Sequence, residues 1–216
     1  MTGDQRIPLP SRTAAARLIV VMRASAAEEY DRVLDVLLGA GVRSVELTLT
    51  TPGTIERLPA LRERYGDVAD LGVGTVVDRE QLRRAAEAGA DYIVTPITSS
   101  ALLAEAARVR VPFVPGGLTP TELESSWSAG ASAVKIFPAG QVGAGYVKDL
   151  RGPFPDMQVV PSGGVDRDSA AAWLRAGAVA VSVGGPLLGD ALRGGDLGAL
   201  RARAEAFVTA CAEAAR

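Results

Sequence analysis

The sequence predicts an α/β fold. Residues 1–216 are expected to form one domain, a single (β/α)8 TIM barrel. Eight short apolar stretches with the composition of strands begin near residues 18, 45, 71, 92, 111, 133, 158 and 179. A segment of helical periodicity follows each of them, so one strand-plus-helix unit recurs about every 19 to 27 residues. A doubly wound open sheet is the alternative, but eight regular units with no second pattern favour a closed barrel.

Local sequence signals predict where the individual helices and strands begin and end. Pro8 and Pro10 block regular structure, so residues 1–10 are expected to form an irregular arm. Thr119 and Glu122 have the spacing of a capping box at a helix start. Ala-Gly-Val or Ala-Gly-Ala recurs where helices end and strands begin. The expected strands cover about 18–23, 44–50, 71–76, 92–96, 111–115, 133–138, 159–164 and 179–185, and the expected helices about 11–17, 26–39, 53–65, 78–88, 99–108, 119–130, 143–150, 167–175 and 197–214.

Composition limits the partners and the compartment. The net charge of -2 argues against a nucleic-acid-binding surface, which would be basic. No apolar run approaches the ~18 residues that span a bilayer, and the N-terminus lacks a signal-peptide pattern. The single cysteine, Cys211, fits a reducing compartment. We therefore expect a cytoplasmic protein that binds neither nucleic acid nor membrane.

The chain contains no histidine. This absence removes Ser-His-Asp and Cys-His nucleophile systems, histidine general bases and histidine metal ligands. With one cysteine, a zinc site would need to be almost entirely carboxylate, so we expect no metal. Any chemistry must use carboxylates, lysine, tyrosine, hydroxyl groups and the backbone.

Two predicted strands carry charges within apolar patterns. Lys135, one of only two lysines in the chain, lies between Val134 and Ile136. In residues 44–50, Glu46 alternates with apolar neighbours and shares one face with two threonines. In a barrel, the continuously apolar face packs on the helices, so Lys135 and Glu46 would point inward, together with Arg23 at the end of the first strand.

A charge inside a barrel needs a partner or a task. One interpretation is a structural ion pair between Glu46 and Lys135. The other is a lysine nucleophile, since a desolvated lysine loses part of its proton affinity and can attack carbonyl carbon. Glu46 would then move protons, and Arg23 would bind a substrate carboxylate.

Glycine turns follow the last two predicted strands. Ser162, Gly163 and Gly164 come after the seventh strand, and Gly184 and Gly185 come after the eighth. Loops at these two places, with exposed backbone N–H groups, commonly bind phosphate in this architecture. Glycine pairs also serve as simple turns, but their joint placement favours a phosphate site.

Seven motifs, in order and at matching spacing, resemble the class I aldolases that cleave 2-keto-3-deoxy-6-phosphogluconate (KDPG) or its galactonate epimer, and related 4-hydroxy-2-oxoglutarate aldolases. The resemblance covers roughly residues 17–190. The motifs are VELTL (45–49), GVGTV (72–76), VTP (94–96), VPG (114–116), VKIFP (134–138), PSGGV (161–165) and VGG (183–185).

The resemblance implies roles for individual residues. Lys135 matches the lysine that forms a Schiff base with the keto acid, and Glu46 matches the glutamate that moves protons through a bound water. Arg23 matches an arginine of the galactonate-type branch. Members are typically homotrimers and need no metal or cofactor. The remaining matches are Thr75 and Pro96 in the pyruvate pocket, and Ser162, Gly163, Gly164, Gly184 and Gly185 in the phosphate loops.

Two positions depart from the family pattern. Thr50 stands where many members have an arginine that contacts the substrate carboxylate, and Pro186 stands where a serine often follows the two glycines. Proline offers neither a hydroxyl nor an N–H to a phosphate oxygen. The resemblance implies retro-aldol cleavage to pyruvate and an aldehyde such as glyceraldehyde 3-phosphate. There are two alternatives without a covalent lysine intermediate. One is a phosphate-binding barrel isomerase or synthase, and the other is a non-catalytic protein that binds a sugar phosphate.

Overall fold

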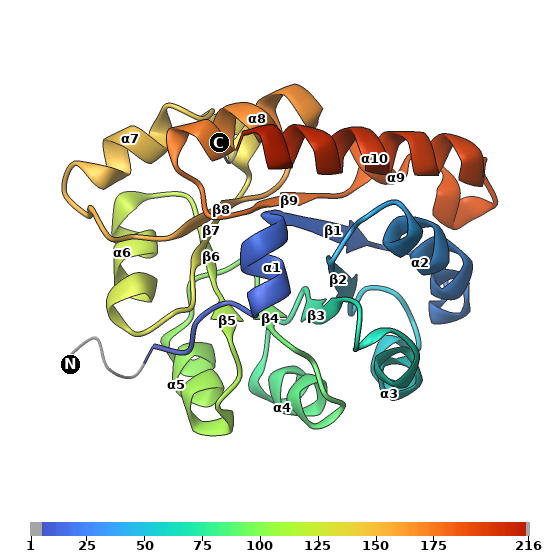
Figure 1. Ribbon diagram of the computed structural model, residues 1–216. Coiled ribbons are helices and arrows are strands. Elements are labelled where there is room, and N and C mark those ends of the chain that lie inside the picture. The colour runs from blue at the N-terminus through green and yellow to red at the C-terminus, as the bar shows by residue number, and fades with distance from the viewer. Residues whose placement is uncertain (1–5, 215–216) are drawn as a thin grey trace.

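The computed structural model describes residues 6–214 and shows an α/β fold in which helices surround a central set of parallel strands (Figure 1). The strands are β1 (Leu18–Met22), β2 (Ser44–Thr48), β3 (Asp70–Gly74), β4 (Ile93–Val94), β5 (Phe113–Val114), β6 (Gly116–Gly117), β7 (Val134–Ile136), β8 (Val159–Pro161) and β9 (Val181–Val183). The α-helices are α1 (Ser11–Ala16), α2 (Tyr30–Gly39), α3 (Thr54–Tyr65), α4 (Arg79–Glu87), α5 (Ser100–Val109), α6 (Pro120–Ser128), α7 (Tyr146–Arg151), α8 (Arg167–Ala176), α9 (Gly185–Leu188) and α10 (Leu197–Glu213), with 3-10 turns η2 (Ala27–Glu29), η3 (Ala139–Gln141) and η4 (Ala191–Arg193).

The strands pair in parallel within two sheets. One sheet has the order β5-β4-β3-β2-β1-β9, and the other has the order β6-β7-β8. Between β8 and β9, Ser162 and Ser182 form an isolated parallel bridge, and the Val179 N–H donates to the Val159 carbonyl at 3.0 Å. Consecutive strands therefore lie side by side, as expected for repeated strand–helix units.

The fifth expected strand, residues 111–115, differs from the prediction. Only Phe113–Val114 of this range form a strand, β5, which pairs with β4, and after Pro115 a second strand outside the expected bounds, β6, pairs with β7. Proline has no N–H to continue a ladder, although the Pro115 carbonyl accepts a hydrogen bond from the Lys135 N–H at 2.7 Å. The expected set of eight uninterrupted strands is thus wrong at this position.

Alternating side chains divide the core into two parts. One set, which includes Val45, Leu47, Val134 and Ile136, packs between the strands and the helices. The other set faces the space enclosed by the strands and forms a smaller apolar cluster. Its members are Leu9, Ile19, Tyr92, Val94, Val114, Ala133, Val160 and Ala180.

The N-terminal arm contributes to this inner cluster. Residues 6–10 form neither helix nor strand, as expected, and residues 1–5 of the predicted arm lie outside the described range. Leu9 is 7% exposed and packs among the inward-facing side chains. Arg6 stacks on Trp127, with its guanidinium carbon 3.4 Å from the ring centre, and hydrogen-bonds to the Ala131 and Trp127 carbonyls. The arm is therefore irregular but packed.

The last expected strand, residues 179–185, is shorter than predicted. Regular pairing ends at Val183, and Gly185 begins the short helix α9, which the sequence analysis did not anticipate. Pro186 lies in the first turn of α9, where the missing N–H of proline would have no helical partner in any case.

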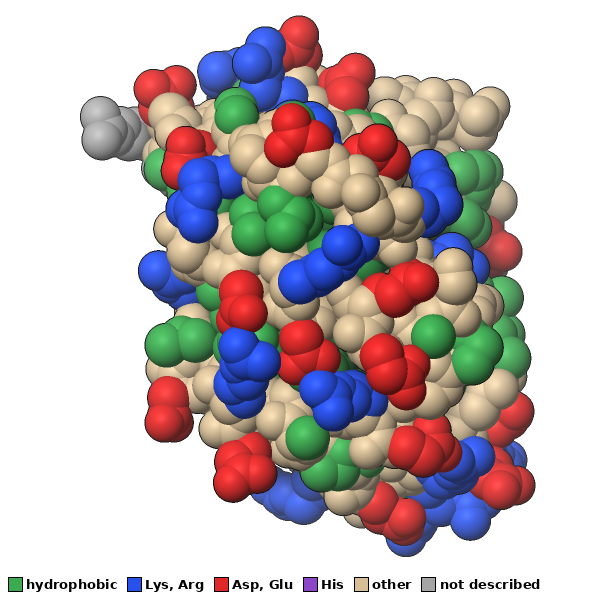
Figure 2. All heavy atoms as spheres, turned by 90° about the vertical axis from the view of Figure 1, so that its right-hand side faces the viewer, with side chains coloured by type: hydrophobic (Ala, Val, Ile, Leu, Met, Phe, Trp, Pro, Cys, Tyr) green, Lys and Arg blue, Asp and Glu red, His purple; other side chains and the backbone are tan. Residues whose placement is uncertain are grey.

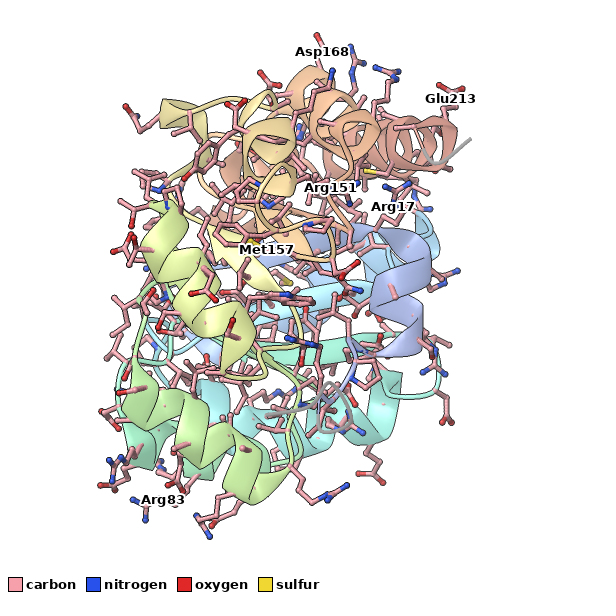
Figure 3. The ribbon with its side chains drawn as sticks, turned by 90° about the vertical axis from the view of Figure 1, so that its left-hand side faces the viewer. Arg17, Arg83, Arg151, Met157, Asp168 and Glu213 are labelled. Atoms are coloured by element: carbon pink, nitrogen blue, oxygen red, sulfur yellow. The ribbon has the colours of Figure 1, made fainter. Side chains whose placement is uncertain are left out.

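Side chains satisfy the helix ends. The expected capping box at Thr119 and Glu122 starts α6. At the C-terminal end of α8, Arg17 donates to the Leu174 carbonyl of the last turn at 3.4 Å and to the Ala178 carbonyl beyond the helix at 2.9 Å. Arg151 donates to the Gly177 carbonyl at 2.7 Å. Figure 3 shows both arginines on the same side of the molecule. Arginines that bind terminal carbonyls stabilise a helix end and oppose its negative dipole.

Acidic and basic side chains are interspersed on the face that carries α2 and α3 (Figure 2). Ion pairs join these helices, for example Arg57 with Asp31 at 2.6 Å and Arg64 with Asp35 at 2.9 Å. Within residues 6–214, no helix has the length and hydropathy required to cross a membrane.

Candidate active site

A cavity of about 440 Å³ lies at the carboxyl ends of the strands and brings together all ten residues that the sequence analysis selected. Loops and strand ends supply its wall, since parallel strands place their carboxyl ends on one side. The ten residues are Arg23, Glu46, Thr75, Pro96, Lys135, Ser162, Gly163, Gly164, Gly184 and Gly185.

Lys135 occupies the middle of β7. Its neighbours Val134 and Ile136 are fully buried against the helices, so the pleat turns the lysine to the opposite side. Lys135 is 7% exposed, and its Nζ lies 5.2 Å from the centre of the Phe137 ring. An amine in this position is shielded from bulk water but open to the cavity.

Glu46 occupies the middle of β2 and is 1% exposed. The sequence places Val45 and Leu47 in the outer core, which turns the carboxylate towards the cavity. Its Oε2 is buried and has no hydrogen-bond partner within the described part of the chain. A carboxylate oxygen in such a place can accept a proton or a hydrogen bond from a bound molecule.

The geometry does not support a structural ion pair between Glu46 and Lys135. Across residues 6–214, the ion pairs within 4.0 Å include neither Glu46 nor Lys135. Both charged side chains nevertheless line the same cavity. Buried charges that are not paired with each other favour a chemical task over a structural one.

Arg23 follows β1 at the mouth of the cavity. Its Nη1 donates to the Thr50 hydroxyl at 2.7 Å. Thr50 was expected on the inward-facing side of residues 44–50, at the place of a family arginine. It does not line the cavity, but it contacts the arginine that does. The other N–H donors of a guanidinium can bind an anion in a fork geometry.

The glycine turns form another part of the cavity wall. Gly163 and Gly164 have φ angles of 81° and 77°, a left-handed conformation that favours glycine at both positions. A side chain at residue 163 would also meet the Phe137 ring. The Ser162 hydroxyl donates to the Ser182 hydroxyl at 3.2 Å. These contacts bring the loop after β8 close to the end of β7 and to β9.

The cavity also contains residues that the sequence analysis missed. Ser182 lies between Val181 and Val183 in β9, so the same alternation that selected Lys135 could have identified it. Phe137 is 39% exposed although aromatic, which only the structure reveals. Val21 and Val165 are further additional lining residues, and Pro186, already noted beside the two glycines, also lines the cavity.

Tyr92 lies in the inner cluster. Its hydroxyl hydrogen-bonds to the Ser44 hydroxyl at 2.9 Å, and its ring covers Gly72. Burial raises the pKa of Tyr92 well above the ordinary value for tyrosine, so it is a neutral phenol. Within the described residues, no group of three or more histidine, cysteine or acidic side chains could hold a metal ion.

Comparison with known proteins agrees with this geometry. The sequence model of the KDPG and KHG aldolase family matches residues 9–202. A 2-dehydro-3-deoxy-6-phosphogalactonate aldolase of Escherichia coli is 34% identical over 171 residues, which cover 79% of this chain and 83% of that protein.

Solved structures give the same result. A native KDPGal structure aligns with a TM-score of 0.84 at 33% identity, covering 91% of this chain and 95% of the other. A chain of a cube-shaped protein cage, designed by fusing symmetric oligomeric domains, aligns with a TM-score of 0.83 at 33% identity, covering 91% of this chain and 72% of that one. The chain therefore belongs to the KDPG and KHG aldolase family.

Proposed function

We propose that this protein is a class I aldolase that cleaves a 2-keto-3-deoxy sugar acid through a Schiff base on Lys135. The observation that carries the proposal is the presence of a buried lysine and a buried, unpaired carboxylate in one cavity. A binding protein has no need to bury both charges. Family membership supports the same activity.

The first half of the reaction makes the covalent intermediate. The neutral Lys135 amine attacks the C2 carbonyl carbon of the keto acid and forms a carbinolamine. Glu46 takes the extra proton of the Lys135 ammonium, which leaves the amine neutral for attack, and then delivers that proton to the C2 hydroxyl, directly or through a water, so that the hydroxyl leaves as water. The resulting protonated imine withdraws electrons from the neighbouring carbon.

The second half breaks the carbon–carbon bond. Glu46, now a carboxylate, takes the C4 hydroxyl proton, the C3–C4 bond breaks, and the electron pair moves through C3 into the imine. The aldehyde leaves, and an enamine of pyruvate remains on Lys135. Glu46 returns the proton that it took from the C4 hydroxyl to C3 of the enamine, and addition of water to the imine then releases pyruvate and restores the free amine.

The other cavity residues bind the substrate in this proposal. Arg23 holds the keto-acid carboxylate, and Thr75 and Pro96 line the pyruvate end. The phosphate of the substrate would lie against the two glycine turns, whose backbone N–H groups suit an anion. Pro186 lines the same region and can give no N–H, so backbone donors of the four glycines carry this contact.

The proposed substrate is KDPG, its galactonate epimer or 4-hydroxy-2-oxoglutarate. The Escherichia coli relative carries the name of an aldolase for the galactonate-type compound, and the family model names both KDPG and KHG. The products are pyruvate and an aldehyde, which is glyceraldehyde 3-phosphate for the phosphorylated substrates.

Trapping with borohydride tests the mechanism. The protein is incubated with millimolar pyruvate and sodium borohydride, and the adduct is located by intact mass and peptide mapping. We expect one carboxyethyl group, on Lys135. Lys148 is the other lysine of the chain and lies exposed on α7, so it serves as an internal control for non-specific modification. No adduct on Lys135 in folded protein would overturn the proposal.

We further propose that the strands close into one eight-stranded barrel, that residues 1–216 form one domain, and that the chain assembles as a cytoplasmic homotrimer. The Ser162–Ser182 bridge and the Val179–Val159 hydrogen bond support closure between β8 and β9. The likeness to a chain of a cage built from symmetric oligomeric domains supports an oligomer. Light scattering during size-exclusion chromatography tests the trimer, and a monomeric mass at micromolar concentration would contradict it.

A further inference from the structure

Two loops at the mouth of the cavity are joined by three hydrogen bonds. The segment after β1 provides Arg23 Nη1, the Ala24 N–H and the Ala27 N–H. The segment after β2 provides the acceptors, which are the Thr50 hydroxyl at 2.7 Å, the Thr51 hydroxyl at 2.9 Å and the Pro52 carbonyl at 3.0 Å. Only the first of these contacts involves a side chain that lines the cavity.

The Thr50 hydroxyl is itself held in place. It donates to the hydroxyl of Thr48 at 3.2 Å, and Thr48 is fully buried at the end of β2. The Thr48 hydroxyl lies 3.3 Å from the hydroxyl of Thr51, which is 1% exposed. The Thr50 hydroxyl therefore donates a hydrogen bond to the buried Thr48 and accepts one from Arg23.

Arg23 needs such a contact. Its side chain is exposed, and a free arginine samples many rotamers, so fixing the side chain when a ligand binds costs conformational entropy. Within the described residues, Arg23 makes no ion pair, and Thr50 is its side-chain hydrogen-bond partner. An anchored guanidinium presents its remaining donors to the cavity before any ligand arrives.

We infer that Thr50 is a positioning residue, which holds Arg23 ready to bind the carboxylate of the pyruvyl half of the substrate. This inference rests on the proposed function. Thr50 does not itself line the cavity but hydrogen-bonds to Arg23, which does, so its effect on a bound keto acid passes through Arg23. The contact should change the affinity for a keto acid and leave the chemical step at saturation almost unchanged.

Pyruvate alone is the probe, because it has the carboxylate and the ketone but neither a phosphate nor an aldehyde half. The measured quantities are the pyruvate concentration for half-maximal borohydride trapping on Lys135 and the trapping rate at saturation. Thr50→Val keeps the shape and loses the hydroxyl, and we expect it to raise the half-maximal concentration about fivefold. Thr50→Ser restores the hydroxyl and should restore the wild-type value.

A double-mutant cycle separates positioning from simple loosening of the loop. In an Arg23→Met background, Thr50→Val should have no further effect, because the group that it positions is gone. Thr98→Val is the matched control, since its hydroxyl binds the Gly116 carbonyl at 2.9 Å in another loop and does not contact Arg23. This control should trap pyruvate like the wild type. If Thr50→Val folds poorly, Thr50→Ala is a second variant that lacks the hydroxyl.

The outcomes distinguish the two proposals. One outcome is that the wild type forms the adduct and Thr50→Val needs the same pyruvate concentration for half-maximal trapping. This result overturns the role of Thr50 and leaves the aldolase proposal intact. An equal effect of Thr50→Val with and without Arg23 also overturns it, because the residue would then act on the loop. Failure of the wild type to trap pyruvate overturns the aldolase proposal and, with it, the carboxylate contact of Arg23.

Discussion

The carboxylate of Glu46 lies directly against Gly74, and a methyl group on residue 74 would overlap its Oε1. The two residues come from the adjacent strands β2 and β3, where Thr48 is the register partner of Gly74. The absence of a side chain on β3 therefore makes the space in which the proposed proton carrier sits.

Gly74→Ala should displace Glu46 and lower turnover about 100-fold, because general acid–base catalysis depends on the position of the carboxylate. Gly145→Ala is the matched control, since nothing lies within 4 Å of a Cβ at that residue. Steady-state pyruvate release from KDPG and its epimer measures the effect. Equal turnover in the two variants would show that Glu46 tolerates the shift.

Lys135→Met should abolish borohydride trapping and lower turnover at least 1,000-fold, on the order of the loss expected for a covalent nucleophile. Glu46→Gln keeps the amine and should still trap pyruvate, but with turnover lowered about 100-fold because proton transfer is impaired. Intact mass and pyruvate release separate the two roles. Turnover that survives Lys135→Met within tenfold would be incompatible with a Schiff base.

Leu9→Ala should lower the free energy of unfolding by about 2–3 kcal/mol, since Leu9 is buried in the inner cluster and its removal leaves a cavity. Val68→Ala is the control, because Val68 is 47% exposed and should change stability by less than about 0.5 kcal/mol. Denaturant unfolding measures both variants. An equally small effect at Leu9 would show that the arm is not part of the core.

Cys211 should be unreactive in the native protein. The thiol is 1% exposed, and burial raises its pKa to about 11, against an ordinary value of 9.0, with a small opposing effect of Arg17. A thiol reagent at pH 8 should modify it only after unfolding. Fast labelling of folded protein would contradict this expectation.

The raised pKa of Cys211 makes the free energy of unfolding depend on pH. The folded state favours the protonated thiol, so the stabilising contribution is complete below pH 9.0 and is lost as the pH rises to about 11. Cys211→Ala should show a shallower loss of stability over this range. Thermal melting at pH 8, 9, 10 and 11 measures the difference in slope, independently of any loss of packing at residue 211 that is common to all pH values.

Local pattern was enough to predict which charged side chains line the cavity. The apolar neighbours of Lys135 and Glu46 showed which face each charge occupies, because the pleat of a strand repeats every two residues. The same alternation applies to Ser182, which lies between the apolar residues Val181 and Val183 and lines the cavity. The motifs also identified the family, and the match over residues 9–202 confirms that prediction.

Other features depend on residues far apart in the chain. The exposed Phe137 ring packs on Gly163, Leu9 packs among strands that follow it, and Arg23 reaches Thr50 across two loops. The sequence suggested that Thr50 represents a missing charge. It could not show that the hydroxyl instead accepts a hydrogen bond from Arg23.

The sequence by itself determined the order of strands and helices, the inward direction of Lys135 and Glu46, and the family. Each follows from contacts between near neighbours or from motifs read directly along the chain. Only the tertiary structure decided that Pro115 divides a strand between two sheets, that Gly185 begins a helix, and that Gly74 makes room for Glu46. These outcomes depend on strand register and on the packing of distant side chains, which no local periodicity encodes.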